Sequence, residues 1–147
     1  MTTYFQSIRA GSTFSSTERI LKRSDIAQFA ELTGDFNPLH TDEAWVRENT
    51  SFPSTIAHGL LVLSAAEGSN CEVTNEWAIL AFLEVQRKML RPVLPGDAIR
   101  QVYTVESTKL SESKRDRGVV TVKVDVVNQD NVVVQTGKNV YLVGAST

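Results

Sequence analysis

The stretch that decides the fold runs from residue 29 to residue 66 and reads FAELTGDFNPLHTDEAWVRENTSFPSTIAHGLLVLSAA. It begins inside a predicted helix, because apolar side chains recur near helical spacing from Ile26 onward. Ser24 or Asp25 is expected to cap the start of this helix. Gly34 is expected to end it, since glycine adopts the left-handed backbone conformation at little cost.

The residues from Asp35 to His40 cannot continue this helix. Pro38 lacks an N–H group and biases Asn37 towards an extended conformation. On a straight helix, residues five apart would point roughly 140° apart. A bent loop can instead bring the two side chains together. We therefore predict a loop that holds the carboxylate of Asp35 and the imidazole of His40 as an acid/base pair.

A second helix is predicted over residues 57–69, which read AHGLLVLSAAEGS. Its apolar residues cover all sides of a helix, so we expect it to be buried all round. Gly59 in its first turn lets another group approach the backbone closely. The free N–H groups of that turn also favour partial negative charge nearby.

The rest of the chain has the patterns of strands. Alternation is clearest in residues 118–127, where the valines at even positions face one way and the polar residues between them face the other. Strands are also predicted over residues 78–90, 98–107 and 132–143, with a short one within 13–22. Early helices followed by consecutive antiparallel strands indicate an α+β fold. A curved sheet wrapped around the second helix would supply the cover that this helix needs.

Length and composition indicate a single domain over residues 1–147. A chain of 147 residues and 16.2 kDa can bury a core of its own. A formal net charge of −2 offers no electrostatic footprint for nucleic acid. The N-terminus lacks a signal-peptide pattern, and the longest apolar run, Leu60 to Leu63, is far shorter than the roughly 20 residues that cross a bilayer. With a single cysteine, these features predict a cytoplasmic protein without membrane contact.

The first helix and the loop after it resemble the signature of the MaoC-like, R-specific enoyl-CoA hydratases. The tripeptide AHG at 57–59 and the turn RPVLPGD at 91–97 are similar to that family too. One position departs: six residues after the histidine, where family members often have a small residue, this chain has Val46. The positions that match the signature are Phe29, Leu32, Thr33, Gly34, Asp35, Asn37, Pro38, Leu39 and His40.

This resemblance implies a hot-dog fold, in which a curved antiparallel sheet wraps around a long central helix. It also implies reversible syn addition of water to a trans-2-enoyl thioester of CoA or an acyl carrier protein, a reaction of fatty acid metabolism that gives a (3R)-hydroxyacyl product. Asp35 and His40 would be catalytic and hold one water between them. Asn37 would brace the loop on the substrate side, and the Gly59 N–H would bind the thioester oxygen. Two roles stay open for Ser64, one turn into the second helix: contact with substrate, or a hydroxyl bonded to its own backbone.

The resemblance implies no metal and no cofactor, because the thioester already makes Cβ electrophilic. It further implies a homodimer or a dimer of dimers. A sheet wrapped around one helix has open edges, and such edges favour pairing with a second copy.

Two other functions stay open at this point. A thioesterase on the same fold would use a carboxylate to direct water at the thioester carbonyl instead of Cβ. A protein that binds acyl thioesters without catalysis is the other alternative. The spacing of Asp35 and His40 argues against the first, and the presence of both residues argues against the second.

Several further expectations concern single residues. His58 is interpreted as structural, holding the approach to Gly59. The basic loop around Arg115 is interpreted as a solvated hairpin tip rather than a CoA phosphate site. Cys71 is interpreted as inert. The acyl chain is expected to run along the second helix past Ala66, with room for six or eight carbons.

Overall fold

Four long antiparallel strands form the main sheet in the computed structural model, which describes residues 1–146. The strands are β3 (Ile79–Met89), β4 (Ala98–Leu110), β5 (Arg117–Val127) and β6 (Val133–Gly144). The sheet order is β1-β4-β5-β6-β3, and the short strands β1 (Thr13–Ser15) and β2 (Arg19–Ile20) both pair with β4. All four predicted strands are confirmed, and the short strand expected within 13–22 is two shorter ones.

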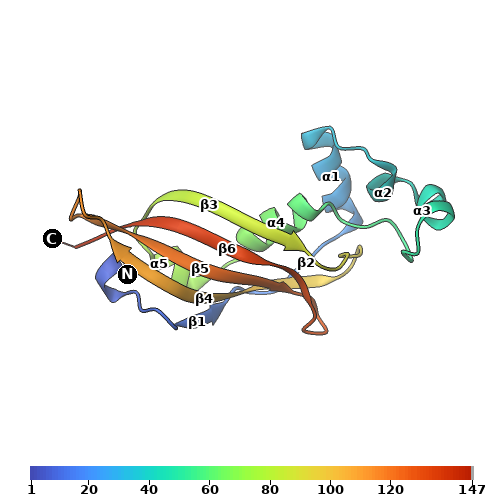
Figure 1. The fold of residues 1–147 in the computed structure, drawn as a ribbon. Coiled ribbons are helices and arrows are strands. Elements are labelled where there is room, and N and C mark those ends of the chain that lie inside the picture. Colours follow the sequence, from blue (N-terminus) through green and yellow to red (C-terminus); the bar gives the residue numbers. More distant parts are fainter. Residues whose placement is uncertain (147) are drawn as a thin grey trace.

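The helices lie in three places along the sheet. The helices α1 (Arg23–Thr33), α2 (Pro38–Thr41) and α3 (Glu43–Asn49) lie together at one end of the sheet, and α4 (Gly59–Glu67) lies against its middle (Figure 1). The single-turn helices η1 (Phe5–Ser7) and α5 (Glu72–Glu76) lie near the opposite end. The sequence analysis predicts only strands after α4, and the helix α5 shows that this prediction is wrong for residues 72–76. A helix of five residues is too short to show an apolar period.

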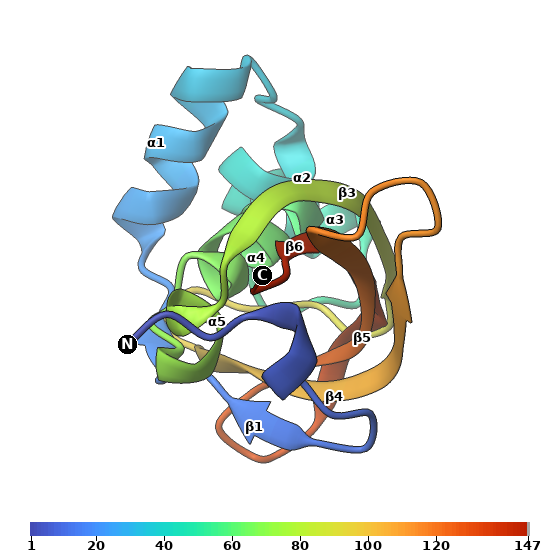
Figure 2. The same ribbon diagram turned by 90° about the vertical axis from the view of Figure 1, so that its left-hand side faces the viewer.

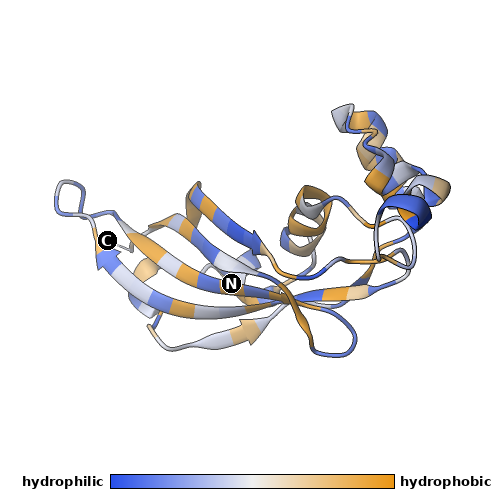
Figure 3. Cartoon of the chain, turned by 45° about the vertical axis from the view of Figure 1, so that its right-hand side comes forward, coloured by the Kyte–Doolittle hydropathy of each residue, from blue (hydrophilic) through white to orange (hydrophobic). Residues whose placement is uncertain are grey.

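The sheet curves around α4, as Figure 2 shows from the end of the molecule. Hydrophobic and hydrophilic bands alternate along its strands (Figure 3). The valines at positions 120, 122, 124 and 126 of β5 are fully buried, as the alternation predicts. This arrangement confirms the expected α+β fold with a curved antiparallel sheet around one helix.

Helix α1 confirms the prediction of a helix that ends at Gly34, which has a φ of 78°. Its start corrects the prediction. The helix begins at Arg23, so Ser24 and Asp25 lie inside it. The Asp25 carboxylate accepts a hydrogen bond from the Lys22 N–H at 2.8 Å. A carboxylate in the first turn thus satisfies a backbone donor by reaching back, without standing at the cap position itself.

Helix α4 is not buried all round, which corrects another prediction. Leu61, Val62 and Ala66 pack in the core, but Leu60 is 64% exposed and Ser64 is exposed as well. The sheet covers only one side of the helix, because β3 ends the sheet as an edge strand. No helix within residues 1–146 is long and apolar enough to cross a membrane.

A polar network joins the end of α4 to the sheet. The Oε1 atom of Glu67 accepts a hydrogen bond from Arg87 Nη2 at 2.8 Å. The same oxygen accepts from Gln101 Nε2 at 3.0 Å and from Asn139 Nδ2. The Arg87 side chain is 1% exposed and that of Glu67 is 21% exposed. The carboxylate therefore holds three donors from three strands under the helix.

Two tyrosines extend this network along the inner face of the sheet. The Gln101 amide donates to the Tyr103 hydroxyl at 2.6 Å, and the Asn139 amide donates to the Tyr141 hydroxyl at 2.7 Å. Burial raises the pKa of both tyrosines well above the ordinary value, with the Glu67 charge adding to the effect. Both hydroxyls thus stay protonated and can serve as donors in turn.

Candidate active site

The predicted acid/base loop contains one helical turn. Pro38 is the first residue of α2, where its missing N–H is tolerated, so His40 lies on a short helix rather than in an open loop. Asn37 caps this turn, since its side-chain oxygen accepts from the Leu39 N–H at 3.0 Å. The Asp35 carboxylate accepts in turn from the Asn37 N–H at 3.2 Å. Asn37 therefore braces the turn, and its contact with substrate stays a prediction.

The turn brings Asp35 and His40 together. Their ligand atoms lie within 4.8 Å of each other, together with one from His58. With hydrogen bonds of about 2.8 Å, a single water can bridge two polar atoms at that separation. Asp35 is exposed and His40 is half-buried, so both can be reached from solvent. The juxtaposition that the sequence predicts is present.

The hydrogen bonds of His40 settle its tautomer. Its Nδ1 lies 2.8 Å from the carbonyl oxygen of Ile56. A carbonyl oxygen can only accept, so Nδ1 carries the proton. In the neutral ring Nε2 then has a free lone pair, which is the form that accepts a proton from water.

Gly59 is the first residue of α4, next to the acid/base pair in space. Helix geometry leaves its N–H without an acceptor inside the helix. A Cβ at this position would approach the Met89 side chain to 3.1–3.3 Å, so a larger residue would displace that side chain. The Gly59 carbonyl accepts from Gln135 at 2.8 Å, which fixes the first turn to β6.

A hollow of about 400 Å³ lies beside His40 and the first turn of α4, and Asp35 does not line it. Both His40 and Gly59 line it, so the two predicted chemical elements open into one space. Its remaining lining is mainly apolar, which suits an acyl chain. These residues are Leu39, Phe52, Ile56, Ala57, Val62, Met89, Leu90, Arg91, Pro92, Val93 and Gln135.

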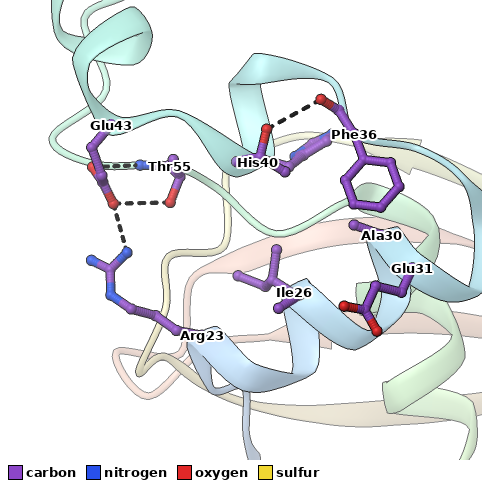
Figure 4. Close-up of a pocket in the computed structure, with 10 residues that line it drawn as sticks. Arg23, Ile26, Ala30, Glu31, Phe36, His40, Glu43 and Thr55 are labelled. Carbon is purple, nitrogen blue, oxygen red and sulfur yellow. Dashed lines mark hydrogen bonds and ion pairs between the residues drawn. The ribbon is translucent and has the colours of Figure 1, made fainter.

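A second hollow of about 360 Å³ reaches His40 from the side of α1. Figure 4 shows Ile26 and Ala30 of α1 facing Phe36 and His40 across it. His40 thus lines both hollows. A ligand that reaches His40 therefore has space on two sides of this residue.

An ion pair closes one end of the second hollow. Arg23 of α1 lies 2.6 Å from Glu43 of α3, and Glu43 also accepts from the Thr55 N–H and hydroxyl at 3.1 and 3.0 Å (Figure 4). The bond from Arg23 lowers the pKa of Glu43. These contacts tie α1, α3 and the segment before Gly59 together around the site.

The three side chains at the centre also have ligand types that bind metal ions. The rings of His40 and His58, however, are stacked, with centroids 3.9 Å apart and planes 29° apart. Stacked imidazoles direct their in-plane lone pairs along nearly parallel planes, so two nitrogens cannot both address one ion at about 2.1 Å. The donor set therefore does not fit a resident metal, and the expected absence of a cofactor stays a prediction.

Other predicted residues lie away from the site. The Ser64 hydroxyl donates to the Leu60 carbonyl of its own helix at 2.8 Å, and neither hollow is lined by Ser64. Ala66 is fully buried in the core and lines neither hollow, so the expected path of the acyl chain past Ala66 is wrong. The loop around Arg115 is an exposed hairpin tip at the far end of the sheet, and Cys71 is buried. Phe52, to which the sequence analysis gives no role, lines the first hollow.

Comparisons with known proteins agree with this site. The model of the family described as "MaoC like domain" matches residues 6–129. The (R)-specific enoyl-CoA hydratase of Aeromonas caviae is 32% identical over 126 residues, which are 83% of this chain and 88% of that protein. The (R)-specific enoyl-CoA hydratase of Rhodospirillum rubrum is 33% identical over 105 residues, 69% of each chain. This chain spans only 29% of Protein MaoC of Klebsiella aerogenes, to which it is 31% identical over 97 residues.

Solved structures show the same architecture. The X-ray structure of a monoamine oxidase regulatory protein from Archaeoglobus fulgidus superposes with a TM-score of 0.90 at 34% identity, covering 99% of this chain and 97% of that one. The (R)-hydratase of A. caviae involved in PHA biosynthesis superposes with a TM-score of 0.73 at 26% identity, covering 96% and 99%. A protein of Mycobacterium tuberculosis with a double hot-dog fold, at 19% identity and a TM-score of 0.84, supports the fold alone.

The fold and the site together define a hot-dog protein with an aspartate–histidine pair beside the N-terminus of its central helix. The chain belongs to the MaoC-like domain family, and it is an enzyme of the MaoC-like dehydratase type. The resemblance seen in residues 29–40 is thereby confirmed over most of the chain.

Proposed function

We propose that this enzyme catalyses R-specific hydration of trans-2-enoyl thioesters, or the reverse dehydration of (3R)-hydroxyacyl thioesters. The observation that carries the proposal is the position of Asp35 and His40, whose polar atoms lie within 4.8 Å of each other and next to the first turn of α4. The relatives from A. caviae and R. rubrum, which are named for this activity, support it. CoA thioesters and carrier-protein thioesters share the reacting group, so both are candidate substrates. A cytoplasmic location stays a prediction.

The geometry suits a simple reaction. Asp35 and the Nε2 atom of His40 would hold one water, and one of them would take its proton as the oxygen attacks Cβ. The electrons of the double bond move to the thioester oxygen as an enolate. The N–H of Gly59 would stabilise that charge, assisted by the dipole of the helix. The group that took the proton from water then delivers it to Cα on the same face, which completes the syn addition.

The test is to incubate the protein with enoyl-CoAs and to follow the loss of the conjugated thioester absorbance. A hydratase gives the (3R)-hydroxyacyl thioester with no release of free thiol. Release of thiol would favour a thioesterase on the same fold. Binding without turnover would favour a non-catalytic acyl-thioester protein.

Chain length is expected to follow the first hollow. Its apolar lining predicts that kcat/KM rises from crotonyl-CoA to a six- or eight-carbon enoyl-CoA, because each methylene that gains apolar cover contributes up to ~0.8 kcal/mol. Phe52→Ala, which removes a ring from the lining, should raise kcat/KM for ten-carbon substrates relative to crotonyl-CoA. Ala66→Leu is the control, since it overpacks the core without reaching the hollow. An unchanged ratio in Phe52→Ala would refute this prediction.

We propose a homodimer that pairs through the edge strand β3. The exposed apolar side chains of this strand include Leu80, Leu83, Val85 and Met89, and such an edge favours association. Light scattering should therefore give about twice the chain mass of 16.2 kDa at micromolar concentration. Leu83→Lys should shift the mass towards the single chain. A wild-type protein that scatters as a single chain would contradict this assignment.

A further inference from the structure

His58 lies where the parts of the site meet. It directly precedes Gly59 at the start of α4, and it is 2% exposed. Its ring lies between two others, with the centroid of Phe29 at 4.9 Å and that of His40 at 3.9 Å. One side chain at the N-terminus of α4 therefore contacts a residue of α1 and a residue of α2.

His58 also holds the backbone of the catalytic aspartate. Its Nε2 lies 3.0 Å from the carbonyl oxygen of Asp35. Because that oxygen can only accept, Nε2 carries the proton and the lone pair is on Nδ1. His58 thus contacts Asp35 by a hydrogen bond and His40 by its ring face.

Packing alone does not explain a histidine at this position. The Nδ1 atom of His58 is buried and has no hydrogen-bond partner among residues 1–146. An unpartnered buried polar atom destabilises the folded state, whereas a phenyl ring would fill nearly the same space without that cost. The donor at Nε2 is the feature that a phenyl ring lacks.

We propose that His58 is a positioning residue of this active site. Its Nε2–H fixes the peptide of Asp35, its ring face fixes the imidazole of His40, and its place in the chain fixes both relative to Gly59. It transfers no proton to or from substrate. This role rests on the proposed hydratase reaction only for its kinetic test.

The consequence is that the three chemical groups share one support. Water attack needs the carboxylate, the imidazole and the Gly59 N–H in register, and small displacements of reacting groups lower rates steeply. Asp35 and Gly59 are 24 positions apart in the chain, but His58 connects the Asp35 carbonyl directly to the start of α4. Loss of the Nε2 donor removes the bond to the Asp35 carbonyl, and loss of the ring removes the stacking partner of His40.

Two variants separate these contacts. His58→Phe keeps a ring against His40 but removes the donor to Asp35. His58→Gln removes the ring but places an amide N–H near the position of Nε2. We expect each to lower kcat for crotonyl-CoA hydration by about tenfold or more with KM changed by less than about threefold, because orientation rather than affinity is lost.

Double-variant cycles identify the partner of each contact. His58→Phe should cost less than about threefold when added to Asp35→Asn, since the carboxylate it misplaces is already removed. His58→Gln should likewise cost little when added to His40→Ala. The limbs of the pH–rate profile should keep their positions in both single variants. Val122→Ala, a core change away from the site, is the control for reduced stability. Its effect on kcat should simply add to the effects of Asp35→Asn and of His40→Ala.

A readout without turnover separates this inference from the hydratase proposal. The chain has only two histidines, so long-range ¹H–¹⁵N spectra of their rings assign each tautomer directly. We expect Nε2–H for His58 and Nδ1–H for His40. The backbone amide of Phe36, in the same peptide unit as the Asp35 carbonyl, should shift in His58→Phe and much less in His58→Gln.

The outcomes are distinct. If the wild type hydrates no enoyl thioester, the hydratase proposal fails, and the ring tautomers and the Phe36 shift decide the role of His58. An Nδ1–H tautomer at His58, additive effects in both cycles, or a lost limb of the pH profile would each overturn the positioning role.

Discussion

Asp35→Asn and His40→Ala are each expected to lower kcat for enoyl-CoA hydration by about 100-fold or more, since positioned acid/base groups contribute about that much. Asparagine keeps the shape of the aspartate and can still accept from the Asn37 N–H, but it cannot take a proton from water. Alanine removes the imidazole, and with it the Nε2 lone pair, from a residue that lines both hollows. Asp35 is exposed and His40 is half-buried, so neither change opens a cavity in the core.

The measurement is the initial rate with crotonyl-CoA, together with far-UV circular dichroism to show that the fold persists. Glu48→Gln is the control, because Glu48 is an exposed carboxylate of α3 that lines neither hollow. It should change kcat by less than about twofold. Near-normal turnover in either variant would remove that residue from the mechanism.

Much of the fold is predictable because it depends on local periodicity. The valines of β5 alternate with other residues from Val120 to Val126, and such a pattern has one buried face whatever the strand pairs with. Gly34 ends α1 because the left-handed conformation is a local preference. The acid/base pair follows from a proline break within six residues. In each case the deciding interaction is between residues that are only a few positions apart in the sequence.

The remainder depends on which segments meet in space. Leu60 and Leu61 are neighbours in an apolar run, but only the sheet decides which of them is buried. His58 contacts Asp35 across 23 positions, and no periodic pattern signals that contact. A signal for the polar network does exist. Gln101 and Asn139 stand at positions that should face inward by strand alternation, where an apolar residue is the norm.

That network leads to the second large prediction. Glu67→Ala should lower the free energy of unfolding by about 3 kcal/mol or more, the cost of removing one partner of a buried ion pair. The guanidinium of Arg87 would remain buried without its carboxylate. The amides of Gln101 and Asn139 would lose the same acceptor. Since the free energy of unfolding of a small domain is only about 5–15 kcal/mol, the change should be plain in urea unfolding.

The cost belongs to the uncompensated charge more than to the lost bond, and a second variant shows this. Adding Arg87→Met to Glu67→Ala removes the buried charge as well, so the double variant should recover part of the lost stability. Glu67→Gln keeps an acceptor oxygen for the amides and should lie between wild type and Glu67→Ala. Glu48→Ala, an exposed change on α3, is the control and should stay within about 0.5 kcal/mol. If the free energy of unfolding of Glu67→Ala is within about 1 kcal/mol of the wild-type value, water reaches Arg87 freely, and the network does not hold α4 to the sheet.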